Sequence, residues 1–202
     1  MHRNIVYRER IMKNLIICLL AMFCVVNVSA QKAKKSELKA QQYAEKYEKS
    51  DDGLSIASVV ENIPLSRRQI FDKFNKLLIV QLKVHEDDIE DRNAMTGTVK
   101  ASLTTDKLLN SGSSLIKGNL EIKLAAKEGK ARIAINIKNY VHYRGNNVIG
   151  EEDVISRPPF ETIDFNDEKS AKATALYNDV FLALDAQVEA LLQAFNDFWG
   201  GK

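Results

Sequence analysis

The chain has 202 residues and a formal charge of +2 at pH 7. Its length suits one domain of about 150 residues with a leader, and a charge so close to zero lacks the basic excess of nucleic-acid-binding proteins. Both cysteines, Cys18 and Cys24, lie within the first thirty residues, so the rest of the sequence holds no disulfide and no thiolate metal site.

Residues 1–30 have the composition of a secretory signal peptide with an N-terminal extension. A basic start at residues 12–14 precedes the apolar stretch 15–26, and small residues then lead to Ala30. This pattern predicts cleavage between Ala30 and Gln31, with export to the periplasm or beyond. The apolar stretch is shorter than the about 20 residues that a transmembrane helix needs, so we expect no membrane span after cleavage.

Cleavage would change the charge of the protein. Lys and Arg fall from 29 to 25 and Asp and Glu from 27 to 26, which leaves about −1 on the exported chain. Translation can begin at Met1 or at Met12, and the exported chain is the same in both cases.

Residues 31–53 are rich in Lys, Glu, Gln and Ala. This composition favours helix but offers no apolar face to bury, so we predict a polar spacer that is solvated and helical part of the time. Turn residues at 50–53 end the spacer, and a single domain is predicted over residues 54–202. The large apolar residues of the spacer are Leu38, Tyr43 and Tyr47.

The domain is predicted to start with a strand and a helix. Leu54 to Val60 alternates as a strand does. Ser66 followed by Gln69 is a capping-box pattern, and it predicts a helix that runs to about Lys83. The apolar side of this helix carries Ile70, Phe71, Phe74, Leu77, Leu78 and Leu82.

An acidic run follows at residues 85–91. Its carboxylates invite a metal interpretation, but it lacks the glycine and the ordered spacing of a calcium loop. His85 and Glu86 do not form a His-Glu-x-x-His pair, because residue 89 is Ile. We therefore predict a solvated connector and no metal site.

Three stretches of alternating residues predict antiparallel strands. Residues 95–104 place Met95 and Val99 on one side and polar residues on the other. Residues 120–124 and 133–137 alternate in the same way around a turn at 127–130, which predicts a hairpin. The returning strand continues to about Arg144.

The end of the chain is predicted to be a long loop and a long helix. Two adjacent prolines at 158 and 159 cannot continue a sheet, so residues 145–166 are expected to cross the domain as a loop. Apolar residues recur every three or four positions from Asp167 to Trp199, which predicts one helix with a single apolar stripe. The apolar side chains expected to hold the loop are Phe160, Ile163 and Phe165.

These elements predict an α+β fold of two layers. Two helices with one apolar side each must cover the same face of an antiparallel sheet of four to five strands. The predicted order is β-α-β-β-β-α, and the other face of the sheet is left in water.

The sequence resembles a family of uncharacterised exported proteins of Gram-negative bacteria, domain of unknown function 4468. The resemblance covers roughly residues 54–144 and the helix that follows. It lies in the capped helix, the strand near Gly97 and the run Ile-Lys-Asn-Tyr-Val-His at 137–142. It implies a TATA-binding-protein-like fold, and it carries over no catalytic residue because the family has none established.

The fold name alone does not indicate DNA binding. TATA-binding proteins wedge phenylalanines between bases from their open sheet face, whereas no Phe is expected on that face here. We therefore expect no nucleic-acid partner. The residues expected on that face are Thr96, Thr98, Lys100, Ser102, Glu121, Lys123, Arg132, Asn136 and Lys138.

A non-enzymatic binding or interaction module of the bacterial cell envelope is the leading functional hypothesis. Tyr140, His142 and Arg144 share one side of the last predicted strand and are candidates for an anionic or sugar-like ligand. The alternative is that all three are ordinary residues of a wet sheet. The expected partner is an envelope protein or a glycan, and no cofactor is expected.

The sequence leaves two other functions to consider, a ligand carrier and a hydrolase. A sheet that grips one long helix resembles helix-grip domains, so the chain is alternatively a carrier of a small apolar ligand, unless large side chains fill the hollow. A hydrolase needs a nucleophile, a base and an orienting acid. Beyond residue 30 the sequence has two histidines, His85 and His142, and no Gly-x-Ser-x-Gly, so no catalytic residue is predicted.

Overall fold

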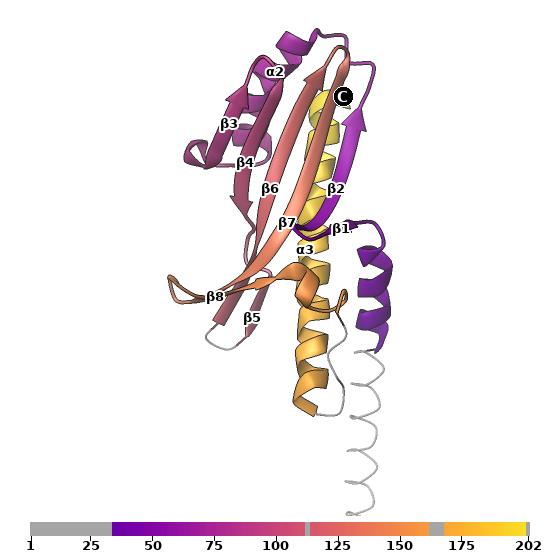
Figure 1. Cartoon of the computed structure of the whole chain (residues 1–202), viewed down its shortest axis with the longest axis vertical. Helices are drawn as coiled ribbons and strands as arrows, with labels where there is room; N and C mark the ends of the chain where they lie inside the picture. Colours follow the sequence, from indigo (N-terminus) through magenta and orange to yellow (C-terminus); the bar gives the residue numbers. More distant parts are fainter. Residues whose placement is uncertain (1–33, 112–113, 162–167, 201–202) are drawn as a thin grey trace, which may run out of the picture.

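A computed structural model describes residues 34–111, 114–161 and 168–200 (Figure 1). The predicted signal peptide, with its cleavage site at Ala30 and Gln31, lies outside the described residues, as do Ile163 and Phe165 of the predicted loop.

The described strands form one eight-stranded antiparallel sheet, in the order β1-β2-β7-β6-β4-β3, with β5 added on β6 and β8 added on β7. The strands are β1 (Glu48–Ser50), β2 (Gly53–Val60), β3 (Ile89–Asn93), β4 (Thr98–Thr104), β5 (Leu109–Ser111), β6 (Ser114–Lys127), β7 (Lys130–Arg144) and β8 (Asn147–Asp153). The predicted hairpin is confirmed as β6 and β7, the two longest strands, which pair along their whole length.

Two helices lie on one face of the sheet (Figure 1). The helix α2 (Arg67–Lys76) starts at the predicted capping box of Ser66 and Gln69 and continues as the π-helix η1 (Leu77–Gln81). The long helix α3 (Glu168–Gly200) runs behind the sheet. This arrangement confirms the predicted two-layer α+β fold. The short 3-10 helices are η2 (Glu86–Asp88) and η3 (Val154–Ser156).

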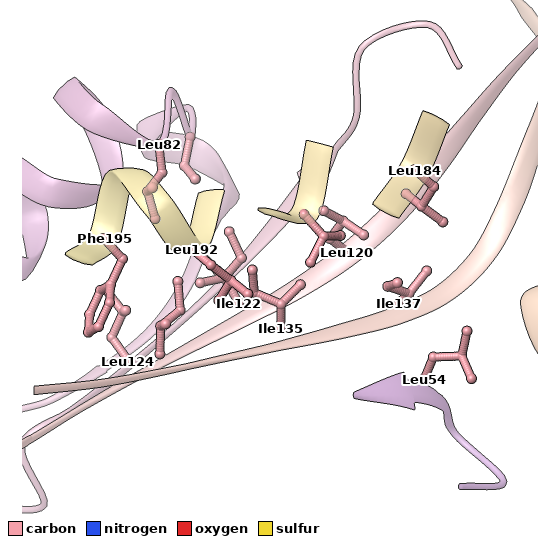
Figure 2. Close-up of a cluster of buried hydrophobic side chains, with 14 of the residues drawn as sticks. Leu54, Leu82, Leu120, Ile122, Leu124, Ile135, Ile137, Leu184, Leu192 and Phe195 are labelled. Carbon is pink, nitrogen blue, oxygen red and sulfur yellow. The ribbon is translucent and has the colours of Figure 1, made fainter. Parts of the chain in front are cut away.

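The core fills the space between these helices and the sheet. Figure 2 shows Leu184, Leu192 and Phe195 of α3 pointing toward the isoleucines and leucines of β6 and β7. Phe74 of α2 and Phe181 of α3 are fully buried in the same layer. Gly118 of β6 leaves room for Leu184, because an added Cβ would lie 2.9 Å from the Leu184 Cδ1 atom.

The sheet has more strands than predicted, because several segments join it by pairing and not by an apolar pattern. The acidic run is only partly a connector, since Ile89–Asn93 is the edge strand β3. The prediction of a loop over residues 145–166 is wrong in its first half. After a turn at Gly145 and Asn146, the chain forms β8, which pairs with β7. Met95 lies in the turn before β4 and is 85% exposed, so its predicted burial is wrong.

Residues 34–47 are not the solvated spacer that we predicted. Residues 34–44 form a helix, which we call the N-terminal helix and which lies beside the lower half of α3 (Figure 1). Ala40 is fully buried there, and the Tyr47 ring packs edge-on against Phe181 with the ring centroids 5.9 Å apart. The Tyr47 hydroxyl donates to Asp185 Oδ1 at 2.9 Å.

Three further polar contacts also tie this segment to α3. The Lys46 ammonium donates to Glu189 at 2.8 Å and lies 3.4 Å from Asp185, and Ser36 donates to Asp179 at 2.6 Å. The described part of residues 31–53 is therefore a packed part of the domain.

Candidate functional site

The three residues predicted as a ligand site do not form an accessible surface. β7 carries a bulge between Ile137 and Asn139, opposite Asn119 and Leu120 of β6. An extra residue in one strand reverses which side chains face the core beyond it. As a result Tyr140 points to the helix side of the sheet and is 0% exposed.

Tyr140 is therefore a core residue in this structure. Its ring lies beside that of Tyr177 in α3, with centroids 5.9 Å apart. Burial raises the pKa of the Tyr140 hydroxyl, whose oxygen has no hydrogen-bond partner within the described residues. Arg144, at the end of β7, is exposed, so the structure separates it from Tyr140.

His142 belongs to a cluster around one carboxylate oxygen of Glu152 in β8. The His142 Nε2 atom lies 3.4 Å from Glu152 Oε2, Arg157 donates to the same oxygen at 3.0 Å, and the Tyr177 hydroxyl donates to it as well. Burial alone would raise the pKa of Glu152, but the bonds from Tyr177 and Arg157 outweigh it and lower the pKa. The cluster ties β8 to α3, which is a structural role.

The sheet face opposite α2 and α3, which we call the open face, is covered by no described helix (Figure 1). At its centre the Glu121 side chain of β6 is contacted by three lysines from three strands. The Nζ atoms lie 3.0 Å (Lys100), 2.7 Å (Lys123) and 3.0 Å (Lys138) from its carboxylate oxygens. We call these four residues the Glu121 cluster.

The charges of the cluster stabilise one another. Burial alone would raise the pKa of Glu121, which is only 5% exposed, but hydrogen bonds from Lys123, Lys100 and Lys138 lower the pKa to about 2. Hydrogen bonds to Glu90 of β3 and to Glu121 raise the pKa of Lys100. The three ammonium groups outnumber the two carboxylates, so the open face carries a net positive charge at its centre.

Two shallow hollows of about 250 Å³ each flank Glu121 on the open face. One is lined by Lys123, Arg132 and Asn136, and the other by Lys138 and Asn139. The amide oxygens of both asparagines are buried without a hydrogen-bond partner within the described residues. The hollows therefore bring ammonium and guanidinium donors together, with the Asp52 carboxylate also lining the first of them.

A larger groove of about 740 Å³ lies on the other side of the molecule, where η1, the end of β4 and α3 meet. Leucines and alanines form the apolar part of its lining, and charged residues, threonines and glutamines form the rest. The lining includes Leu82, Leu103 and Leu191 together with Lys83, His85 and Lys117. The Lys83 backbone has a φ of 58°, in the left-handed region.

Among residues 34–111, 114–161 and 168–200, no group of three or more His, Cys, Asp or Glu side chains is arranged to hold a metal ion. No helix in those same ranges is long and apolar enough to cross a membrane.

Sequence reasoning placed all four members of the Glu121 cluster on the open face but missed that they meet. The register supplies the missing information: Lys100 pairs with Lys123, and Ser102 pairs with Glu121. Two lysines directly opposite each other repel, so they need an acid nearby that both can contact. A correct alignment of the strands would have placed Glu121 beside Lys100 and Lys123 and so indicated the cluster.

Comparison with known proteins gives a likeness of fold. No family model matches the sequence, and no curated protein matches it. Among solved structures, the chain is similar to a DUF4468 family protein from Bacteroides ovatus, with a TM-score of 0.52 at 12% identity. The match covers 74% of this chain and 90% of that chain. The resemblance to this family is thereby confirmed at the level of the fold.

A TBP-like protein from Parabacteroides distasonis is also similar, with a TM-score of 0.49 at 14% identity, over 73% of this chain and 95% of that chain. At 12% identity, the likeness to the Bacteroides ovatus structure shows the fold alone, and the function has to be argued from the site.

Proposed function

We propose that this chain is an exported, non-enzymatic binding module of the bacterial cell envelope, and that it binds its partner through the open face. The observation that carries the proposal is the Glu121 cluster, with its three ammonium groups fixed on a sheet face that no described helix covers. An extended polymer can bind along such a face without any rearrangement of the fold.

The partner we propose is a polymer that bears carboxylates. The side chains of Lys123 and Lys138 are 62% and 49% exposed, so a carboxylate can reach them without displacing Glu121. Arg132, also exposed, lines the neighbouring hollow and adds a planar donor that suits a carboxylate.

The test compares binding of an oligogalacturonate and an oligoglutamate to the wild type and to a triple variant, Lys100→Gln, Lys123→Gln and Lys138→Gln. Titration calorimetry at low and high salt is the measurement. We expect the triple variant to bind at least about tenfold more weakly, because one exposed charge contact contributes up to about 1 kcal/mol and three are removed. Binding of one oligomer alone would distinguish a glycan from an acidic protein segment.

The matched control is a second triple variant, Lys73→Gln, Lys76→Gln and Lys107→Gln, which removes the same charge away from the open face. It should bind like the wild type. Equal loss in both triple variants would mean that only net charge matters, and binding of neither oligomer would contradict the proposed partner.

Export and the absence of catalysis are tested separately. Fractionation of cells followed by N-terminal sequencing should find the mature protein outside the cytoplasm, beginning at Gln31. A protein retained in the cytoplasm with residues 1–30 attached would contradict export. Turnover of any substrate in a hydrolase panel, abolished by His142→Ala, would contradict a non-enzymatic role.

The groove of about 740 Å³ favours a second candidate function, carriage of a small ligand with an apolar body. Its volume falls in the range of small-molecule sites, and its leucines lie beside Lys83 and Lys117. The space between α3 and the sheet is filled by Phe74, Phe181 and Phe195, so the ligand would lie in this groove. A fluorescent fatty acid should bind the wild type, and this binding should be lost in the Leu191→Glu variant. Absence of any dye binding would rule this candidate out.

A further inference from the structure

The sheet has one edge that is only half covered. β1 pairs with Gly53, Leu54 and Ser55 of β2 and goes no further. β7 pairs with the other side of β2 up to Val60. Within the described residues, no strand pairs with the outer side of residues 56–60, so their outward N–H and C=O groups are available to another chain.

This edge lacks the features that usually prevent pairing between proteins. Residues 56–60 read Ile-Ala-Ser-Val-Val, with no charge and no proline, and Val59 is 50% exposed. The opposite edge strand, β3, carries Glu90, Asp91 and Arg92 in a row. Charged side chains on an edge discourage strand addition, whereas an uncharged β-branched edge favours it. The edge at β2 therefore lacks the charged side chains that protect the edge at β3.

We propose that two copies of this chain pair through this edge, strand β2 against strand β2, about a two-fold axis at Ser58. In that register Ile56 of one protomer opposes Val60 of its partner, and Ala57 opposes Val59. Both pairs are apolar and no like charges meet, so the segment is complementary to itself, as a two-fold interface requires.

The surroundings of the edge limit the pairing to this register. At one end β1 occupies the place beside Ser55. At the other end the chain leaves the strand after Val60, and Asn62 adopts a φ of 60°. A hollow of about 230 Å³ next to Ile56 and Ala57 leaves space for the end of the partner's strand.

The dimer would join the two sheets into one continuous sheet with both open faces on the same side. The inference does not rest on the proposed function, because the edge and the Glu121 cluster are separate. Five residues from each copy bury less than the roughly 800 Å² per partner of a standard stable interface, so we expect association only in the micromolar range or weaker.

The experiment is sedimentation equilibrium of the signal-cleaved protein over a wide concentration range, with Val59→Lys as the test variant. The wild type should shift from monomer to dimer as its concentration rises, and Val59→Lys should remain monomeric because two ammonium groups would meet near the axis. The control is Val148→Lys, which places the same charge on a valine of β8 that is 53% exposed. It should dimerise like the wild type.

Hydrogen exchange adds a readout that locates the contact. The backbone amides of residues 56–60 that point away from β7 should exchange more slowly at high protein concentration in the wild type and not in Val59→Lys. A wild type that stays monomeric at every concentration, or a dimer that Val59→Lys leaves intact, would overturn the proposal. Circular dichroism of both variants checks that the fold is retained.

Discussion

At the scale of single residues, Glu121 shows how a buried acid on a sheet can organise the charges around it. Its pKa falls from its ordinary value of 4.5 to about 2 because three lysines stabilise the carboxylate more than burial destabilises it. The folded protein thus holds the proton less tightly than the unfolded chain does. The resulting stabilisation is complete above pH 4.5 and is lost as the pH falls toward 2.

Glu121→Gln should remove this dependence. At pH 7 we expect the variant to lose about 1–3 kcal/mol of unfolding free energy, a range discounted because the three lysines are partly exposed. Between pH 4.5 and 2 the wild type should lose this advantage, so the two urea midpoints should converge. Parallel curves at all pH values would show that the cluster does not stabilise the fold.

Tyr140 provides a second test at this scale. Its hydroxyl is buried with no described hydrogen-bond partner, so Tyr140→Phe should be neutral or stabilise by up to about 1 kcal/mol. Tyr177→Phe is the control, because that hydroxyl donates to Glu152 and its loss should destabilise by about 1–2 kcal/mol. Thermal unfolding of both variants is the measurement. A Tyr140→Phe variant less stable than Tyr177→Phe would place a bound group at Tyr140.

At the scale of elements, the N-terminal helix shows what the sequence pattern can miss. Ser36, Ala40 and Tyr43 recur at helical spacing along one side of this helix, and Tyr47 follows just beyond its end. This side is made of small and aromatic residues with polar tips, so it reads as weakly amphipathic. It packs because α3 offers matching polar partners such as Asp185, which no local pattern reveals.

We expect Tyr47→Ala to destabilise the protein by about 2–4 kcal/mol, because the residue loses a buried ring and a hydrogen bond to Asp185. Leu38→Ala is the control on the same segment. Leu38 is 59% exposed, so its truncation should change the unfolding free energy by less than about 0.5 kcal/mol. Chemical denaturation measures both, and equal effects would mean that the segment does not pack in solution.

β8 was missed for a different reason. Its sequence, Asn-Val-Ile-Gly-Glu-Glu-Asp, has neither alternation nor β-forming composition at its acidic end. It is a strand because β7 extends past the core and because Glu152 reaches Arg157 and Tyr177. Pairing and tertiary contacts decide such a segment, whereas the β6 and β7 hairpin was predictable because its buried isoleucines alternate in the sequence itself.

At the scale of the whole molecule, the fold class follows from one-sided helices and alternating strands, and the placement of the candidate site does not. The bulge in β7 places the Tyr140 side chain in the core, and only the pairing of β7 with β6 reveals this bulge. The Glu121 cluster needs the register of β4, β6 and β7 at once. The pattern of a single sequence shows the local periodicity of each segment. It does not show how distant strands align, and these sites depend on that alignment.

The long ladder of β6 and β7 should be the most stable part of the protein. We expect backbone amides in residues 120–126 and 131–137 to exchange with solvent only through global unfolding, since these segments are central in the sheet and covered by both helices. Amides of the N-terminal helix should exchange faster. Exchange measured by mass spectrometry checks the order, and equal rates would indicate a single cooperative unit.

The position of α3 in the chain has a consequence for how the protein is made. Every described strand precedes this helix, yet Phe181, Leu184 and Phe195 of α3 are needed to cover the buried face of the sheet. Until α3 has been synthesised, the apolar face of the sheet therefore lacks the side chains that cover it. We therefore expect the domain to complete its core only after α3, its last described element, has been made.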